Sequence, residues 1–176
     1  GCPPFGVKYP YFVEETSIAM KRTVKLPIEG GCQCGALRYE VTAAPLMIYA
    51  CHCTNCQRIT GSAFVLSTTI MEDSLRFTRG EPHIVEWRSE AGNLRFGQFC
   101  GDCGCRIAHG STPSIGILSL RAGTFDDTRW VVPAGHIWTR SAQSWIRYDP
   151  EDILCDIQPT DYMPFITRFQ TCVSFE

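Results

Sequence analysis

Seven of the chain's eleven cysteines fall in three short clusters, and these clusters restrict how the chain can fold. The clusters are Cys32-Gln33-Cys34, Cys51-His52-Cys53-Thr54-Asn55-Cys56 and Cys100-Gly101-Asp102-Cys103. Thiols one or two residues apart can bind one tetrahedral zinc ion from a single turn of chain. The spacing therefore predicts a fold built around metal sites that join distant segments.

The first and third clusters together predict a closed zinc site. Each supplies two thiolates, and strand pairing that brings the two segments together completes a tetrahedron of four. Such a site has no free position and stabilises the fold. We expect Cys32, Cys34, Cys100 and Cys103 to have this structural role.

The middle cluster predicts a site of another kind. Cys51, Cys53 and Cys56 offer three thiolates, which leaves the fourth position of a tetrahedral ion open to water or a substrate. Zinc there could hold an exogenous thiol as its thiolate, because coordination lowers a thiol's pKa. Disulfides and an iron–sulfur cluster are the alternative uses of these cysteines.

Composition narrows the possible partners and the location. Hydrophobic residues make up 44% of the 176 residues, which is enough for a core, and the chain length suits one domain. The net charge of -2 argues against a nucleic-acid or anionic-membrane surface. We therefore expect the chain to bind neither nucleic acid nor membrane. Many cysteines without a visible secretory signal favour a reducing compartment, so we expect the protein to be cytoplasmic.

The N-terminal segment differs from the rest of the chain. It begins Gly1-Cys2-Pro3-Pro4, without an initiator methionine. We expect residues 1–19 to be a remnant of an expression vector or a loosely attached extension, although a native processed N-terminus is the alternative. Residues 20–176 should form one zinc-binding domain, with its motifs within 29–148.

The hydrophobic pattern predicts mostly β structure. Leu37, Tyr39 and Val41 alternate with polar residues, as in a half-buried strand. A helix should run from about Asn55 to Thr60 and end at Gly61. Together these patterns predict a single antiparallel β domain with the cysteines on strand ends and turns. Further strands are expected at 46–50, 63–70, 74–78, 83–88, 93–99, 114–121, 131–139 and 143–148.

Four segments resemble one known family. They are GGCQCGALRYEV (30–41), CHCTNCQRITGSAF (51–64), FCGDCG (99–104) and HIWTRSAQSW (136–145). These motifs resemble the GFA domain, which is named for the glutathione-dependent formaldehyde-activating enzyme and also occurs in centromere protein V. The resemblance implies an antiparallel "tent" fold around two zinc ions, one structural and one catalytic. It also implies that Cys51, Cys53 and Cys56 hold the catalytic ion.

The sequence departs from the family pattern at two places. Gln57-Arg58 stands where the family often has two basic residues, and Cys105 replaces a small non-ligand residue. Cys105 could be inert or could close the open site; we expect it not to bind zinc. Arg58, and also Arg38, could bind substrate carboxylates, although a solvated surface arginine is the alternative. Phe64, Trp138 and Trp145 could line a pocket or belong to the core.

The resemblance implies carbon–sulfur lyase activity on a glutathione-type thiol and an aldehyde such as formaldehyde, a detoxification reaction. Phe64 and Arg58 are the expected substrate-binding residues. A related glutathione conjugate is another possible substrate, and a zinc-stabilised binding module without turnover is the alternative function. His52, Asp102 and water are candidates for a general base, and His136 could be a site or a core residue.

Overall fold

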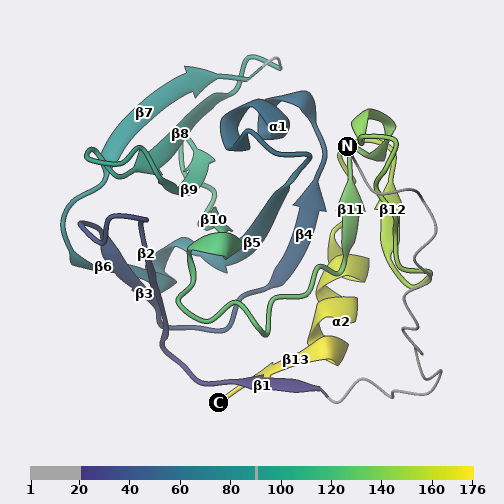
Figure 1. Ribbon diagram of the computed structural model, residues 1–176, viewed down its shortest axis with the longest axis horizontal. Coiled ribbons are helices and arrows are strands. Elements are labelled where there is room, and N and C mark those ends of the chain that lie inside the picture. Colours follow the sequence, from purple (N-terminus) through teal and green to yellow (C-terminus); the bar gives the residue numbers. More distant parts are fainter. Residues whose placement is uncertain (1–20, 90) are drawn as a thin grey trace, which may run out of the picture.

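The computed structural model describes residues 21–89 and 91–176, and it is mainly β (Figure 1). The predicted N-terminal extension, residues 1–19, lies outside the described residues. The largest sheet has eight strands, in spatial order β12 (Ile153–Cys155), β11 (Gly135–Ile137), β4 (Met47–Cys51), β5 (Val65–Met71), β10 (Ile117–Arg121), β9 (Arg106–Ser111), β8 (Leu94–Phe99) and β7 (His83–Arg88).

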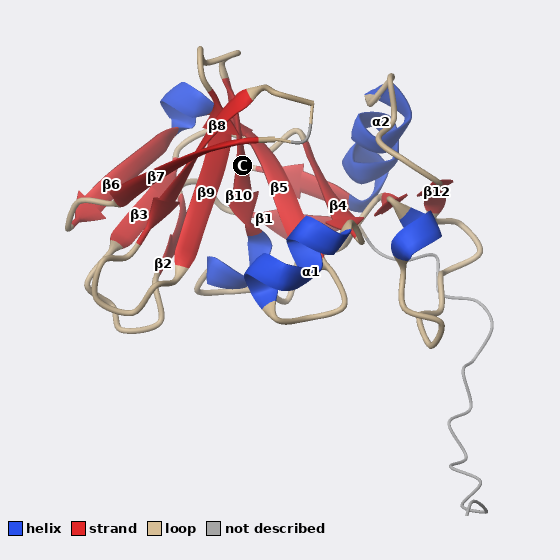
Figure 2. Ribbon diagram, turned by 90° about the horizontal axis from the view of Figure 1, so that it is seen from above, coloured by secondary structure: helices blue, strands red, loops and turns tan. Residues whose placement is uncertain are grey.

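Two smaller sheets and two helices complete the fold (Figures 1 and 2). A three-stranded sheet contains β2 (Ile28–Gly31), β3 (Arg38–Val41) and β6 (Leu75–Arg79), while β1 (Arg22–Val24) pairs with β13 (Val173–Phe175). The helix α1 (Thr54–Thr60) packs against β5, and α2 (Met163–Cys172) packs against β4. Short 3-10 turns occupy 72–74, 122–124 and 139–141. No helix among the described residues is both long enough and apolar enough to cross a membrane.

Most strand pairs are antiparallel, but the prediction of a single antiparallel sheet system is wrong at three pairings. β11 runs parallel to both of its neighbours, β4 and β12, and β1 runs parallel to β13. Antiparallel neighbours can be joined by tight turns, whereas parallel neighbours need a long connection. β11 follows β4 only after many intervening strands, so a turn between them does not set its direction.

The core lies between the centre of the large sheet and the elements that pack on it. All five residues of β4 are buried, which suits a strand at the middle of a sheet. Ile48, Ile70 and Leu120 are fully buried on paired strands, and Phe165 and Phe169 of α2 are each 1% exposed. Burial of these apolar groups stabilises the sheet that carries the middle cysteine cluster.

The helix α1 forms where the sequence predicts it. Cys53 caps its N-terminus, because its sulfur accepts a hydrogen bond from the Cys56 amide at 3.3 Å. Gly61 ends it with a φ of 61°, a left-handed conformation that glycine adopts without strain. The cap therefore places two cysteines of the middle cluster on the first turn of a helix.

Two secondary-structure expectations need correction. The segment 143–148 contains no strand, although its apolar and polar residues alternate. It follows the 3-10 turn at Thr139–Ser141 and remains irregular. The helix α2 was not predicted, because its aromatic and β-branched residues favour strands. Its signals were Pro164 in the first turn and the spacing of Phe165 and Phe169, four residues apart on one face.

Candidate metal centres and the adjoining pocket

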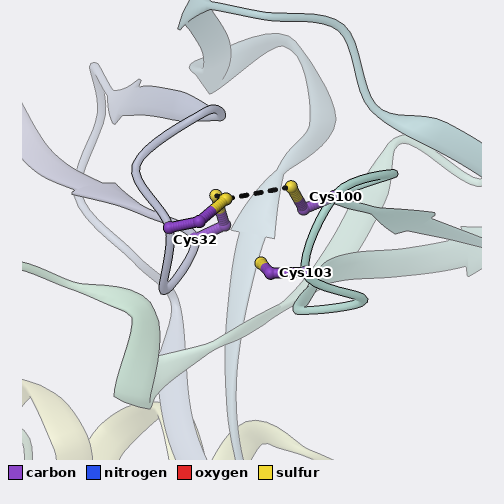
Figure 3. Close-up of side chains that lie close together, drawn as sticks. Cys32, Cys100 and Cys103 are labelled. Carbon is purple, nitrogen blue, oxygen red and sulfur yellow. Dashed lines mark hydrogen bonds between the residues drawn. The ribbon is translucent and has the colours of Figure 1, made fainter.

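The first and third cysteine clusters come together as the sequence predicts (Figure 3). Cys32 and Cys34 lie on the turn between β2 and β3, and Cys100 and Cys103 lie on the turn between β8 and β9. All four sulfurs lie within 4.8 Å of one another, and we call them the four-thiol group. Figure 3 shows Cys32 facing Cys100 and Cys103 from the opposite loop.

The spacing of the four-thiol group fits a tetrahedral zinc ion. A Zn–S bond of about 2.3 Å places two tetrahedral ligand sulfurs roughly 3.8 Å apart. The Cys32 and Cys34 sulfurs are 3.5 Å apart, and those of Cys34 and Cys100 are 3.7 Å apart. The donor set and its geometry therefore suit zinc.

A backbone hydrogen bond favours the thiolate form of Cys32 in the four-thiol group. Burial opposes ionisation of Cys32, but the Leu37 amide donates to its sulfur at 3.2 Å and neighbouring thiols add further hydrogen bonds. The balance lowers the pKa of Cys32 to about 6. On the opposite turn, the Gly104 amide donates to the Cys100 carbonyl at 3.0 Å, and Gly104 has a φ of 70°. This tight turn directs both of its cysteines at one point.

The middle cluster also gathers into one site, which we call the three-thiol group. Cys51 ends β4, while Cys53 and Cys56 flank the start of α1, and their sulfurs lie within 4.8 Å of one another. Hydrogen bonds from Cys51 and Cys56 lower the pKa of Cys53 to about 2. The same contact with Cys53 raises the pKa of Cys51, so the three thiols titrate as a coupled group.

A set of backbone contacts holds the three-thiol group in place. The His52 amide donates to the Ile137 carbonyl of β11 at 3.0 Å. The Gln57 side chain donates to the His52 carbonyl at 2.7 Å and to the Ser141 carbonyl at 2.8 Å. The Ser141 hydroxyl also donates to the His52 carbonyl, at 3.0 Å. Gln57 thus joins the start of α1 to the segment that follows β11.

The His52 ring is not a member of the three-thiol group. Its Nε2 lies 2.8 Å from Nδ1 of His136, whose Nε2 lies 3.2 Å from the Asp152 carboxylate. Burial lowers the pKa of His52, and His136 adds to this effect. Burial also lowers the pKa of His136, although Asp152 opposes it. Sequence reasoning missed Asp152, since nothing in the spacing indicates that β12 lies beside β11.

A pocket of about 460 Å³ opens beside α1 and the turn that follows β8. Phe64, a predicted substrate-binding residue, lines it and lies 5.2 Å, between ring centroids, from His52. Cys105 also lines it and belongs to neither thiol group. The remaining lining residues are Ile59, Thr60, Val65, Leu66, Phe99, Gly104, Arg106, Arg121 and Gly123.

The other predicted contact residues lie elsewhere. Arg58 is exposed on α1 and does not line this pocket. Arg38 forms an ion pair with Asp126. Trp145 is 61% exposed, and the Trp138 indole donates to Gln158 at 3.0 Å. Arg106 and Arg121, which line the pocket, were not predicted because only the strand register brings them to it.

The chain is similar to known proteins both in fold and in sequence. A crystal structure of a Rhodobacter sphaeroides protein is similar over 60% of this chain and 92% of its own, with 22% identity and a TM-score of 0.46. The profile of the family described as glutathione-dependent formaldehyde-activating enzyme, GFA, matches residues 27–141. Since this match covers more than half of the chain and includes all seven clustered cysteines, the protein belongs to the GFA family.

Proposed function

We propose that the protein is a zinc-dependent carbon–sulfur lyase that acts on a glutathione-type thiol and an aldehyde such as formaldehyde, or on a related glutathione conjugate. The observation that carries this proposal is the contrast between the two thiol groups. Four sulfurs complete one tetrahedral donor set, whereas three sulfurs leave the other one ligand short. The family membership supports the same reaction.

The cysteines would hold two zinc ions with different roles. Cys32, Cys34, Cys100 and Cys103 would bind the structural ion, and Cys51, Cys53 and Cys56 would bind the catalytic one. Zinc bound by three thiolates supplies a Lewis acid that keeps a substrate thiol deprotonated near neutral pH. In the tent fold implied by the family, both ions would connect turns at the ends of strands.

In the proposed reaction, the substrate's thiolate sulfur attacks the carbonyl carbon of the aldehyde. A carbon–sulfur bond forms, the π electron pair of the carbonyl moves onto oxygen, and that oxygen takes up a proton from water. The protein's contribution is to hold the reactants close, which removes much of the entropic barrier. Phe64 would form an apolar wall, and the Gln57 and Ser141 contacts would keep the three thiols fixed.

Exchange spectroscopy with carbon-13 formaldehyde and glutathione tests the activity directly. We expect the zinc-loaded protein to accelerate exchange between free formaldehyde and S-hydroxymethylglutathione. The variant Cys53→Ser should lose most of this acceleration, whereas Cys155→Ser, which lies outside both thiol groups, should keep it. A protein that binds two zinc ions but leaves the exchange rate unchanged would indicate the binding module instead.

A further inference from the structure

One face of the eight-stranded sheet concentrates positive charge beside the three-thiol group. The strand pairing places His109 opposite both Gly97 and Ser119. A register shift after Gln98 pairs Arg106 with Phe99, so Arg106 shares that face with His109. Arg121 pairs with Ser67, and Ser67 pairs with Tyr49 of β4, two residues before Cys51. This face therefore runs from Arg106 to the first cysteine of the three-thiol group.

Arg121 is the residue that connects this face to the three thiols. It is 7% exposed, and its Nη1 is buried without a hydrogen-bond partner among the described residues. Burial lowers its pKa, while the Cys56, Cys51 and Cys53 thiols oppose that shift, which places all three within electrostatic reach. Its guanidinium therefore lies close enough to the three thiols to interact with them electrostatically.

Arg106 places a second positive charge at the wall of the pocket. Its guanidinium carbon lies 4.8 Å from the centre of the Trp87 ring and 5.5 Å from that of Phe99, so two aromatic faces orient it. Its Nε is buried and unpartnered within residues 21–89 and 91–176. Burial and the proximity of Arg121 lower its pKa to about 9, which leaves it charged at neutral pH.

Among the described residues, no carboxylate forms an ion pair with either arginine. No aspartate or glutamate lines the pocket, and none occurs among the described positions that pair across this face of β4, β5, β10, β9, β8 and β7. Buried guanidinium groups are costly without a partner, and one left with unpaired donors is more costly still.

We infer that Arg106 and Arg121 bind a carboxylate of the substrate, so that the pocket selects a thiol that carries an anionic group. This inference rests on the proposed function, since it takes the substrate's sulfur to lie at the three-thiol group. Guanidinium groups suit this role because their donors match the two oxygens of a carboxylate. The substrate would then span the pocket, with its sulfur toward Cys56 and its carboxylate toward Arg106.

Calorimetry on the zinc-loaded protein with three probes tests the inference. Glutathione carries both thiol and carboxylates, its diethyl ester masks both carboxylates, and S-methylglutathione masks the thiol. The wild type should bind glutathione about tenfold or more tightly than the diester, as expected for a charged hydrogen bond. In Arg106→Met, glutathione affinity should fall to the level of the diester, whose own affinity should not change.

Matched variants separate the pocket from general charge effects. Arg88→Met removes an exposed arginine from β7 and should leave all three affinities unchanged. Arg106→Lys should recover part of the preference. Arg121→Met should act like Arg106→Met; if it loses zinc, as elemental analysis would reveal, Arg106→Met decides the question.

Distinct outcomes separate the inference from the proposed function. Equal binding of glutathione and diester by the wild type, or an equal loss for both in Arg106→Met, would overturn the inference, while exchange activity would still support the lyase. Conversely, S-methylglutathione could bind as tightly as glutathione and lose affinity in Arg106→Met. In that case the carboxylate site stands, and the sulfur does not reach the thiol group. Wild-type protein that binds none of the probes overturns the inference.

Discussion

At the scale of single residues, the position of the three-thiol group depends on side chains outside it. Gln57 donates two hydrogen bonds to the carbonyls of His52 and Ser141, and so joins the start of α1 to the segment that follows β11. His52 lies between Cys51 and Cys53, with its ring buried against Phe64 and His136. Such supporting groups fix the direction of the ligands around them.

Gln57→Ala should weaken zinc binding at the three-thiol group by about tenfold or more, the usual effect of losing an outer-shell contact. The reason is that the Ser141 carbonyl loses the Gln57 donor, the His52 carbonyl is left with the Ser141 hydroxyl, and the 51–56 segment gains freedom. Competition with a chromogenic chelator measures the affinity. Arg58→Ala, on the exposed side of the same helix, is the control and should retain zinc. Unchanged zinc affinity in Gln57→Ala would show that the two Gln57 hydrogen bonds have no part in holding the metal.

His109 makes stability depend on pH. Burial and the nearby Arg106, Arg121 and Arg95 lower its pKa to about 3, whereas an unfolded histidine has a pKa near 6.5. Below about pH 6.5 the unfolded chain takes up a proton that the folded protein does not, so the free energy of unfolding falls as pH falls toward 3. His109→Gln should reduce this slope by up to about 1.4 kcal/mol per pH unit.

Urea denaturation of wild type and His109→Gln, at several pH values between 6.5 and 4, measures this difference. Proton uptake by zinc ligands affects both proteins equally and cancels in the comparison. His83→Gln, at an exposed position on β7, is the control and should follow the wild-type curve. Parallel curves for wild type and His109→Gln would mean that His109 takes up its proton in the folded state.

At the scale of secondary-structure elements, the sequence predicts best where a pattern is local. The strand 83–88 is confirmed with the same bounds, and α1 ends at the glycine that was expected to end it. The gathering of the cysteines was also predictable, because the spacing of possible metal ligands can be read directly from the sequence. The arginine pair, the His136–Asp152 contact and the parallel pairing of β11 were not, since each depends on which strands become neighbours.

The helix α2 gives the element-scale prediction. Phe169→Ala should destabilise the protein by about 3–5 kcal/mol, because a fully buried ring leaves a cavity between α2 and the elements that pack on it. Met163→Ala, at a position that is 58% exposed on the same helix, should cost well under 1 kcal/mol. Thermal and urea denaturation measure both changes. Similar small losses in the two variants would show that α2 adds little to the stability of the sheet.

At the scale of the whole molecule, the two thiol groups differ in what they connect. The three-thiol group lies within one short stretch of chain at the end of β4. The four-thiol group joins the three-stranded sheet to the eight-stranded sheet, and its sulfur contact between Cys34 and Cys100 spans 66 residues. The small sheet also contacts the segment that follows β10, where Gly30 bridges to Phe125 and the Tyr39 hydroxyl bonds to Thr124 at 2.7 Å, and its buried side chains share one core with the large sheet.

This difference predicts that the two groups respond unequally to mutation. Cys100→Ala should lose one equivalent of zinc and destabilise the fold by several kcal/mol, because metal binding that closes a long loop contributes directly to folding. Cys53→Ala should lose the other equivalent but lower the melting temperature far less, since its loop is short and already held by Gln57 and α1. Zinc analysis together with calorimetric melting curves measures both effects.

Cys155→Ala, in β12 and outside both groups, is the control and should keep both zinc ions. Removal of zinc by a chelator should also distinguish the two thiol groups. The three-thiol group should release zinc first with little loss of β structure by circular dichroism, and the four-thiol group should release it later as the fold is lost. Equal losses of stability in Cys100→Ala and Cys53→Ala, or simultaneous release of both ions, would mean that the two sites form one cooperative unit and do not have separate structural and catalytic roles.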